Sequence, residues 1–312
     1  MTILVCGEAL YDVFFDGERP EGFTLDARIG GSCFNVAVGV ARLGARVGLL
    51  TGMSRDRLGE KLVSTLDAEG VDTGFLARKD ATTTLAMVSL QADGSAQYQF
   101  YGEGAADRAV TLADLPPVNV FDVAVFGCFS LLTVPTGDSF LTLAGRAAEA
   151  GKLVALDPNV RPTVEPDADV WRSRVDAFAQ HADIIKVSAE DLAFLYPGET
   201  VEARAAAWRD GGTAVVVVTN GGDGVRLFAA GVDVTVAADK VAVVDTVGAG
   251  DSFLAALLVH LVDAGKANSA ALGALTADDA REALAFATHA AAVTCGRRGA
   301  DLPRRSDLSS VI

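Results

Sequence analysis

The chain has 312 residues, half of them hydrophobic, which is enough to bury a sizeable core in one large α/β domain or two smaller ones. Its 41 acidic residues outnumber the 26 Lys and Arg residues, and the formal net charge of −15 would repel a phosphate backbone. No basic run offsets this charge, so nucleic acid is not expected as a partner.

The N-terminal residues do not have the pattern of a secretory signal. The first fifteen, MTILVCGEALYDVFF, lack a basic region and carry acidic residues early. Apolar stretches elsewhere are too short or too interrupted to span a bilayer. The four cysteines lie far apart, without a CxxC pair or a histidine at metal-ligand spacing. We therefore expect a soluble cytoplasmic protein with reduced cysteines and no membrane partner.

Short, almost entirely apolar runs alternate with helix-like segments along the chain. Such runs are typical of strands covered on both faces. They include residues 2–6, 46–50, 122–126, 153–157, 183–187 and 214–219. Alternating strands and helices predict a parallel, doubly wound sheet, in which ligands bind beyond the carboxyl ends of the strands.

Two stretches break this pattern and predict a small antiparallel sheet. Residues 82–102 alternate between two faces, and Asp93-Gly94 supplies a hairpin turn within them. Residues 10–30 contain two further strand-like runs around a polar turn. Such a sheet is either a lid over a site or an ornament at the sheet edge, and the periodicity favours neither.

A glycine-containing turn in the N-terminal half, GGSCFN at residues 30–35, precedes a helix that ends at Gly44. Its two glycines let the backbone approach a ligand closely, and the amide of Asn35 can both donate and accept hydrogen bonds. Asp12, after the first strand, offers an acceptor pair for neighbouring hydroxyls. Taken singly, each of these residues is explained more simply as part of a turn or cap.

The strongest motif is DTVGAGD at residues 245–251, a turn that leads into an apolar helix. Unpaired amides at a helix N-terminus can hold phosphate oxygens. A carboxylate there, Asp251, can take a proton from a hydroxyl that lies in line with a transferred phosphoryl group. From this motif alone, a helix cap is the simpler explanation of Asp251.

Other nucleotide-binding and catalytic motifs fail. The chain has no GxxxxGK[ST] loop, and Phe253 takes the position of the third dinucleotide glycine. Its three histidines have no G-x-S-x-G elbow beside them. These exclusions favour a different scheme of phosphate binding.

Together, the two turns resemble the signatures of the ribokinase-like (PfkB) carbohydrate kinases. GGSCFNVAVGVARLG resembles the N-terminal signature and DTVGAGDSFLAA the C-terminal one, and the likeness runs from Gly7-Glu8 to Arg298-Gly299-Ala300. It implies a Rossmann-like α/β core with a small antiparallel β-sheet lid, and phosphoryl transfer from Mg-ATP. The implied core is residues 1–10, 31–81 and 103–312, and the implied lid is residues 11–30 and 82–102.

The resemblance also assigns roles to single residues, and it overrides the capping explanation of Asp251. Asp251 is the implied base. The amides that form the implied anion hole are those of Gly248, Ala249 and Gly250. The implied sugar contacts are Asp12, Gly31 and Asn35.

Within the family, the chain most resembles the fructokinases, through residues 100–108, 126–131, 157–161 and 186–188. These stretches add Arg108 and Arg161 as sugar contacts, and Lys186 and Ser188 as ATP contacts. The implied reaction converts D-fructose to fructose 6-phosphate. A kinase for 2-keto-3-deoxygluconate or another keto sugar is an alternative, with Arg108 or Arg161 holding the acid. A non-catalytic sensor is another, although a binder has no need of Asp251.

The likeness further implies nucleotide and metal sites. The expected ATP contacts are Thr219, Gly221, Gly224, Thr288 and Ala291. Where many relatives have Asn-x-x-Glu, this chain has SAED at residues 188–191, which leaves open whether Glu190 or Asp191 organises the waters of Mg²⁺. Asp245, Val247 and residues 297–299 resemble a monovalent-cation site, as for K⁺. The apolar faces of the lid offer a homodimer interface.

Overall fold

A computed structural model describes the whole chain except residues 91–95 and 309–312. The predicted Asp93-Gly94 turn lies outside the described residues. Of the described helices, none is both long and apolar enough to cross a membrane.

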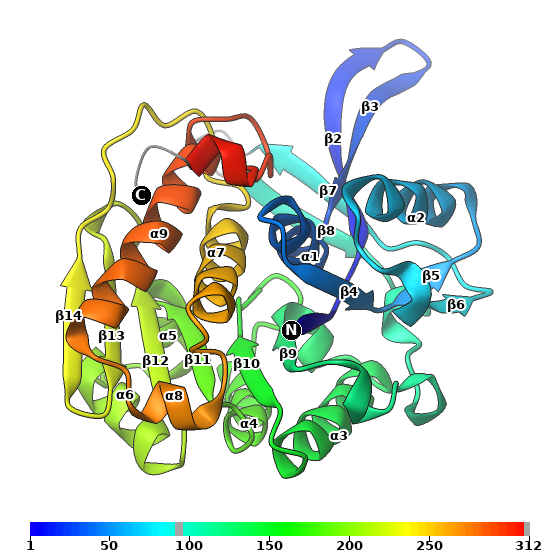
Figure 1. The fold of residues 1–312 in the computed structure, drawn as a ribbon. Helices are drawn as coiled ribbons and strands as arrows, with labels where there is room; N and C mark the ends of the chain where they lie inside the picture. Colours follow the sequence, from blue (N-terminus) through cyan, green and yellow to red (C-terminus); the bar gives the residue numbers. More distant parts are fainter. Residues whose placement is uncertain (91–95, 309–312) are drawn as a thin grey trace.

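An eight-stranded sheet forms the centre of the molecule, in the order β14-β13-β12-β11-β10-β9-β1-β4 (Figure 1). The neighbours from β4 to β12 are parallel, whereas β13 and β14 join the edge as antiparallel strands. The strands are β1 (Thr2–Cys6), β4 (Arg46–Leu50), β9 (Val123–Gly127), β10 (Leu153–Asp157), β11 (Ile184–Ser188), β12 (Val215–Thr219), β13 (Val225–Ala229) and β14 (Val232–Val236).

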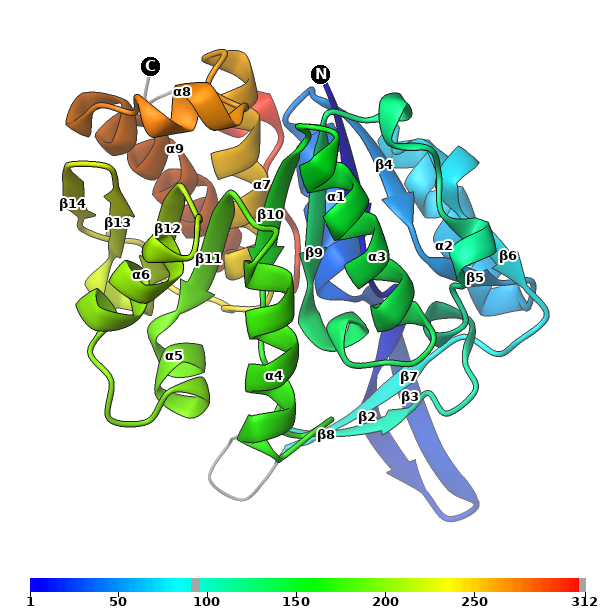
Figure 2. The ribbon, with the colours of Figure 1, turned by 90° about the horizontal axis from the view of Figure 1, so that it is seen from below.

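Helices cover both faces of this sheet, so successive side chains of its inner strands enter two separate cores (Figure 2). In β1, Ile3 and Val5 pack on one side, whereas Leu4 and Cys6 pack on the other. The first core includes α1 (Ser32–Arg42), α2 (Arg57–Glu69), α7 (Ala249–Asp263), α8 (Ser269–Gly273) and α9 (Ala277–Cys295). The second includes α3 (Thr136–Glu149), α4 (Ala168–Ala179), α5 (Ala189–Leu195) and α6 (Val201–Asp210).

A four-stranded sheet, β3-β2-β7-β8, stands at the edge of the α/β core, and its β2–β3 hairpin projects away from the body (Figure 1). Both hairpins are antiparallel, and the parallel pairing of β2 with β7 joins them. The strands are β2 (Leu10–Arg19), β3 (Gly22–Gly30), β7 (Leu85–Leu90) and β8 (Ala96–Tyr101). Two short strands, β5 (Gly52–Ser54) and β6 (Ala77–Lys79), form a separate parallel pair. Along the chain, they follow β4 and precede β7.

The predicted fold class is confirmed, and each of the six predicted core strands lies within one residue of its observed bounds. The antiparallel pair β13 and β14 was not predicted. In β14 the residues alternate between buried and exposed, because this strand is at the open edge of the sheet. Its pattern therefore differs from that of the fully apolar strands at the centre.

Candidate active site

Two cavities open at the carboxyl ends of the central strands, where a parallel sheet binds its ligands. The first, which we call the polar cavity, has a volume of about 520 Å³ and is lined by β2, α1, the small sheet and the loops after β9 and β10. The second, the apolar cavity, has a volume of about 270 Å³ and lies between the loop after β12 and helices α7 and α9. Thr246 and Gly250 line both cavities, so the turn before α7 separates them.

The structure brings most of the predicted site residues to these two cavities. The polar cavity is lined by Asp12, Gly31, Asn35, Arg161, Glu190, Val247, Gly248, Gly250 and Asp251. The apolar cavity is lined by Thr219, Gly221, Gly224, Ala249, Gly250, Thr288 and Ala291. Neither lining includes Arg108, Lys186, Ser188, Asp191 or Asp245.

The turn at the start of α7 leaves backbone amides available. Gly248 occupies the N-cap position with φ 80°, and a Cβ there would lie 2.8 Å from the side chain of Ala300, so this turn requires glycine. The amide of Ala249 already donates to the Thr246 carbonyl at 3.2 Å. Within the described part of the chain, the amides of Gly248, Gly250 and Asp251 have no hydrogen-bond acceptor. They lie where the helix dipole is positive, so they can hold an anion.

The carboxylate of Asp251 is buried at this turn and is held by α1 rather than by its own helix. Its Oδ1 accepts a 2.6 Å hydrogen bond from the Ser32 hydroxyl, and its Oδ2 accepts a 2.8 Å bond from the Asn35 amide. No side chain caps α7, so the capping explanation of Asp251 is wrong. Burial raises the pKa of Asp251, although the bonds from Ser32 and Asn35 and the charge of Lys186 oppose this shift.

Glu8 organises the start of α1, and we did not predict its role. It is 1% exposed, and its Oε1 accepts the amide of Ser32 at 2.8 Å while its Oε2 accepts the hydroxyl of Ser130 at 2.8 Å. Gly31 precedes the helix with φ 103°, and a Cβ there would lie 2.8 Å from the Glu8 carbonyl oxygen. The glycine therefore lets strand β1 and helix α1 meet beside the polar cavity.

Asp12 and Arg161 both line the polar cavity and carry opposite charges. Burial raises the pKa of Asp12 to about 6, the positive charge of Arg161 lowers it, and Asp251 and Glu8 raise it. Burial would lower the pKa of Arg161, but the neighbouring Cys128, Asp251, Asp191 and Glu8 raise it above its ordinary value. The guanidinium thus stays charged among several acidic groups.

The remaining wall of the polar cavity combines strained backbone with aromatic rings. Cys128 and Asn159 follow β9 and β10 with φ values of 55° and 40°, which few residues other than glycine adopt. Tyr98 stacks on Phe100 with ring centroids 6.4 Å apart, and Phe100 meets Phe129 edge-on at 5.5 Å. None of these residues was predicted as a ligand contact, because positive φ angles and packing across the small sheet leave no sequence motif.

Lys186 lies beneath the turn, in a buried ion pair. Its ammonium, on a residue 4% exposed, donates to Asp157 Oδ2 at 2.7 Å, and a Cβ on Gly250 would lie 3.2 Å from the same nitrogen. Burial would lower the pKa of Lys186, but Asp157 raises it above the ordinary value. Its positive charge therefore adds to that of the helix N-terminus.

The two acidic candidates for a metal's water shell differ in position, because Glu190 lines the polar cavity whereas Asp191 interacts with Asp157 and Lys186. Burial raises the pKa of Asp191 to about 6, the charge of Asp157 raises it further, and Lys186 lowers it. Asp157 Oδ1 is buried without a hydrogen-bond partner. The described residues contain no group of three or more His, Cys, Asp or Glu that could hold a metal directly. The buried Asp157 oxygen and the Asp191 carboxylate are acceptors of the kind to which waters around a phosphate-bound Mg²⁺ donate.

Ser188 and Arg108 lie outside both linings. Ser188 is the N-cap of α5, and its hydroxyl accepts the amide of Asp191 at 2.9 Å. The guanidinium of Arg108 lies 5.3 Å from the ring centroid of Phe129, which itself lines the polar cavity. Arg108 thus contacts the aromatic wall through a cation–π interaction with Phe129.

Asp245 joins the turn to the C-terminal segment. Its Oδ1 accepts the amide of Val247 at 3.1 Å, and its Oδ2 accepts the amide of Gly299 at 2.8 Å. The two segments that resemble a monovalent-cation site are therefore adjacent in the structure.

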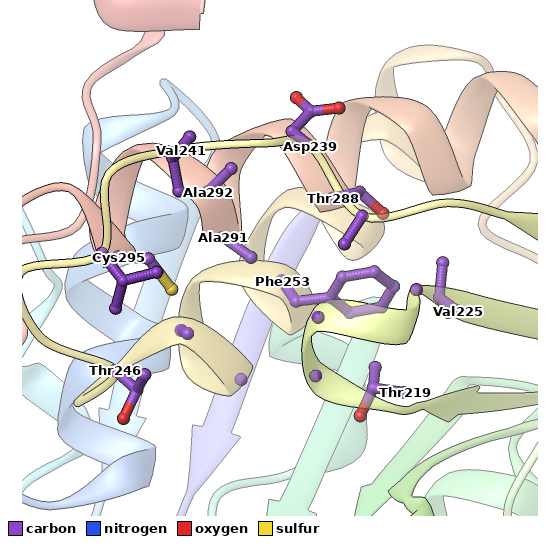
Figure 3. Close-up of a pocket in the computed structure, with 17 residues that line it drawn as sticks. Thr219, Val225, Asp239, Val241, Thr246, Phe253, Thr288, Ala291, Ala292 and Cys295 are labelled. Atoms are coloured by element: carbon purple, nitrogen blue, oxygen red, sulfur yellow. The ribbon is translucent and has the colours of Figure 1, made fainter.

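The apolar cavity has few polar side chains (Figure 3). Thr288 and Ala291 of α9 lie near the ring of Phe253 of α7, which is 3% exposed. The hydroxyl of Thr288 is buried without a hydrogen-bond partner. At the rim, Asp239 Oδ2 lies 2.8 Å from Nδ1 of His289. We did not predict Phe253 and Asp239 as cavity residues, because one lies inside an apolar helix and the other in a loop without a motif.

Comparison with known proteins gives one family. Residues 2–307 match the model of the pfkB family carbohydrate kinases. A fructokinase of Rhizobium leguminosarum bv. trifolii is 39% identical over 265 residues, which cover 83% of this chain and 79% of that protein.

Solved structures agree with this match. A fructokinase with bound ATP from Xylella fastidiosa has a TM-score of 0.91 at 28% identity, covering 99% of this chain and 97% of that one. A fructokinase double mutant from Vibrio cholerae O395, in a fructose, ADP and potassium ion bound form, has a TM-score of 0.85 at 26% identity, with the same coverage of 99% and 97%.

Proposed function

The chain belongs to the pfkB family of carbohydrate kinases, and from this premise we propose that it transfers the γ-phosphoryl group of ATP to the 6-hydroxyl of D-fructose. One observation carries the proposal: the Asp251 carboxylate and the open amides of the turn lie where the polar and apolar cavities meet. A sugar hydroxyl and a nucleotide phosphate can therefore approach one another there. The fructokinases among the relatives support fructose as the sugar.

Each part of the turn has a role in this transfer. Asp251 accepts the proton of the attacking hydroxyl as the bond to phosphorus forms. The amides of Gly248 and Gly250 bind the charge that develops on the transferred group, and the charge of Lys186 strengthens this field. The amide of Ala249 contributes less, because it already has an acceptor.

The sugar occupies the polar cavity, between hydrogen-bonding groups and the aromatic wall. Asp12 accepts bonds from adjacent hydroxyls, Asn35 both donates and accepts, and Gly31 provides close backbone approach. Arg161 donates to ring or carbonyl oxygens. The aromatic rings cover the apolar face of the sugar. Arg108 acts on the sugar only through Phe129.

ATP occupies the apolar cavity with its base against Phe253, Thr288 and Ala291, and the loop of Thr219, Gly221 and Gly224 follows its ribose and phosphates. Mg²⁺ supplies charge neutralisation on the phosphates, and Asp191, more than the exposed Glu190, orders its waters. Lys186 and Ser188 support the phosphate end without lining the base pocket. Asp245 and Val247 belong to a K⁺ site beside the turn.

The four-stranded sheet, which is formed largely from residues within 11–30 and 82–102, acts as a lid that closes over the bound sugar. Closure excludes water, which would otherwise hydrolyse ATP. The outer part of the hairpin exposes large apolar side chains, with Phe15 49%, Phe23 62% and Leu25 49% exposed. A second copy of the chain that covers this surface would form a homodimer. Reduced cysteines and the use of ATP favour the cytoplasm as its location.

A coupled ADP-release assay tests the proposal, with Mg-ATP and a panel of fructose, ribose, glucose, tagatose and 2-keto-3-deoxygluconate. Turnover that depends on fructose supports it. A preference for 2-keto-3-deoxygluconate would assign Arg161 to a carboxylate and overturn the choice of sugar. Silence on every sugar, together with tight sugar or ATP binding, would indicate a sensor.

A further inference from the structure

Three side chains and the base form a continuous line of hydrogen bonds across the floor of the polar cavity. Nη1 of Arg161 donates to Asn159 Oδ1 at 2.7 Å, and Asn159 Nδ2 donates to the Ser32 hydroxyl at 2.7 Å. The Ser32 hydroxyl in turn donates to Asp251 Oδ1 at 2.6 Å. The line connects the loop after β10 with the first residue of α1 and with α7.

The direction of this line is fixed by chemistry. A guanidinium has no acceptor, so the amide oxygen of Asn159 must face Arg161 and its NH₂ group must face Ser32. The Ser32 hydroxyl accepts that bond and has its proton free for the carboxylate of Asp251. Every donor therefore points toward Asp251, and aligned bonds of this kind strengthen one another in a low-dielectric site.

The backbone is shaped to hold the two middle members. Asn159 has φ 40°, a left-handed conformation that asparagine tolerates better than most residues. Its carbonyl oxygen also accepts from Arg161 at 3.1 Å, which fixes the side chain and backbone of Asn159 against the same group. Ser32 is held from behind, because its amide donates to the buried Glu8 at 2.8 Å. Neither side chain has much freedom to turn away.

We propose that Ser32 and Asn159 are positioning residues that hold the Asp251 carboxylate in the plane in which it receives the proton of the sugar hydroxyl. The inference rests on the proposed function of Asp251 as the base. Asn35 fixes the second oxygen at 2.8 Å, so the carboxylate is held at both ends. Without Ser32 it keeps one side-chain hydrogen bond and can rotate about the Cβ–Cγ bond.

The same bond also stabilises the ionised form of the base. The titratable groups that interact with Asp251 are Lys186 of β11, Asp157 of β10, Arg161 after β10 and Asp12 of β2, together with the neutral thiol of Cys33 in α1. Removing the Ser32 hydroxyl leaves all of them in place and takes away one donor to the carboxylate. The pKa of Asp251 therefore rises, and the acid limb of kcat/KM moves to higher pH.

The first experiment compares Ser32→Ala with Ser32→Thr by coupled ADP release over a range of pH. We expect Ser32→Ala to lower kcat at neutral pH about tenfold and to move the acid limb up by about one pH unit. The KM for ATP should stay within about twofold, and Ser32→Thr, which keeps the hydroxyl, should recover the position of the limb. Ser139→Ala is the matched control, because that buried hydroxyl of α3 donates to the Val110 carbonyl, away from both cavities.

The second experiment tests whether the two residues act in series. Asn159→Gly keeps the left-handed backbone and removes the amide, and we expect a smaller fall in kcat than for Ser32→Ala. In a serial chain, adding Asn159→Gly to Ser32→Ala causes no further fall in kcat. Effects that multiply in the double variant would overturn the chain, and so would a Ser32→Ala enzyme with the parent's kcat and acid limb.

A failure of the proposed function would look different. In that case the parent chain itself releases no ADP with any sugar. The hydrogen-bond line is then judged from the carboxyl ¹³C titration of Asp251, identified as the signal lost in Asp251→Asn. A midpoint that rises in Ser32→Ala supports the chain, and one that stays unchanged overturns it.

Discussion

The two cavities that meet at the turn before α7 are built on different physical principles. The polar cavity is lined by charged and hydrogen-bonding groups that hold each other in fixed positions, such as Asp251 between Ser32 and Asn35. The apolar cavity is formed by small residues, glycines and one aromatic ring, Phe253, with few polar side chains. One cavity selects by directed hydrogen bonds and the other by shape.

This difference predicts which substitutions should reduce activity most. A site made to hydrogen-bond a hydroxyl loses much when one partner is missing, because the remaining groups are left buried and unpaired. An apolar slot loses about as much as the contact area removed. Variants of the polar cavity that remove a direct contact with the sugar should therefore have the largest effects on turnover, and variants of the apolar cavity should have smaller ones.

The largest effect is expected for Asp251→Asn. The amide cannot accept the hydroxyl proton, so kcat should fall by about 10³-fold or more. The substitution is isosteric, so thermal unfolding and ADP binding by calorimetry should stay close to those of the parent. Asp263→Asn at the other end of α7, where the carboxylate pairs with Arg305, is the control. Near-normal turnover of Asp251→Asn would show that the base lies elsewhere.

The next largest effect is expected on the free energy of unfolding, from a substitution in the buried ion pair between Lys186 and Asp157. Lys186→Met leaves the buried Asp157 without its counter-ion, and Asp157 Oδ1 already lacks a partner. Breaking a buried pair on one side costs about 3 kcal/mol or more in the free energy of unfolding, as urea denaturation would measure. Lys266→Met, which breaks the more exposed pair with Asp279, should lower the free energy of unfolding much less. Equal losses in the free energy of unfolding would mean that the buried ion pair contributes no more to stability than the more exposed one.

A third test uses pH. In the proposed complex, ionised Asp12 accepts hydrogen bonds from sugar hydroxyls, and its raised pKa of about 6 means that protonation begins close to neutral pH. The kcat/KM for the sugar should therefore fall as the pH drops through about 6. Asp12→Asn should lower kcat/KM by about 10²-fold at pH 8 and remove this part of the acid limb. Asp26→Asn on β3, half-exposed beside Arg28, should match the parent at every pH. If Asp12→Asn leaves the acid limb of kcat/KM unchanged, this limb reports the protonation of Asp251 alone.

Much of this arrangement could be predicted from the sequence. The central strands are apolar on both faces, and this pattern predicted their positions and the parallel sheet. The GGSCFN and DTVGAGD turns indicated Gly31, Asn35 and Asp251 as site residues, and all three line the polar cavity. Both turns lie at helix starts, where positive φ angles at Gly31 and Gly248 favour glycine. The roles of Asn35 and Asp251 were assigned through the resemblance to the family's two signatures.

The supporting groups could not be predicted, because they depend on distant packing. Glu8 binds the start of α1 only because β1 ends beside that helix, and Ser32 reaches Asp251 across 219 positions of the chain. The side chain of Asn159 is positioned by a left-handed backbone conformation after β10, which the residue type alone does not predict. Thr288 and Ala291 of α9 were predicted as ATP contacts, but Phe253 was not, because it lies within an apolar run.

The smallest effect is expected in the apolar cavity, from Thr288→Val. The hydroxyl of Thr288 is buried in the lining of the cavity and has no partner among the described residues, so a base nitrogen of ATP is the partner that we expect. Valine has nearly the same shape but no hydroxyl. The KM for ATP should rise about fivefold, in line with one neutral hydrogen bond, while the KM for the sugar stays unchanged.

The free protein should respond in the opposite direction. An unpaired buried hydroxyl costs about 1–3 kcal/mol, so Thr288→Val should raise the Tm of the unliganded chain while it weakens ATP binding. Thr294→Val on the same helix is the matched control, because its buried hydroxyl already donates to the Ala290 carbonyl at 3.2 Å. It should lower the Tm and leave the KM for ATP alone. A higher Tm for Thr288→Val with an unchanged KM for ATP would mean that the apolar cavity binds its base by shape alone.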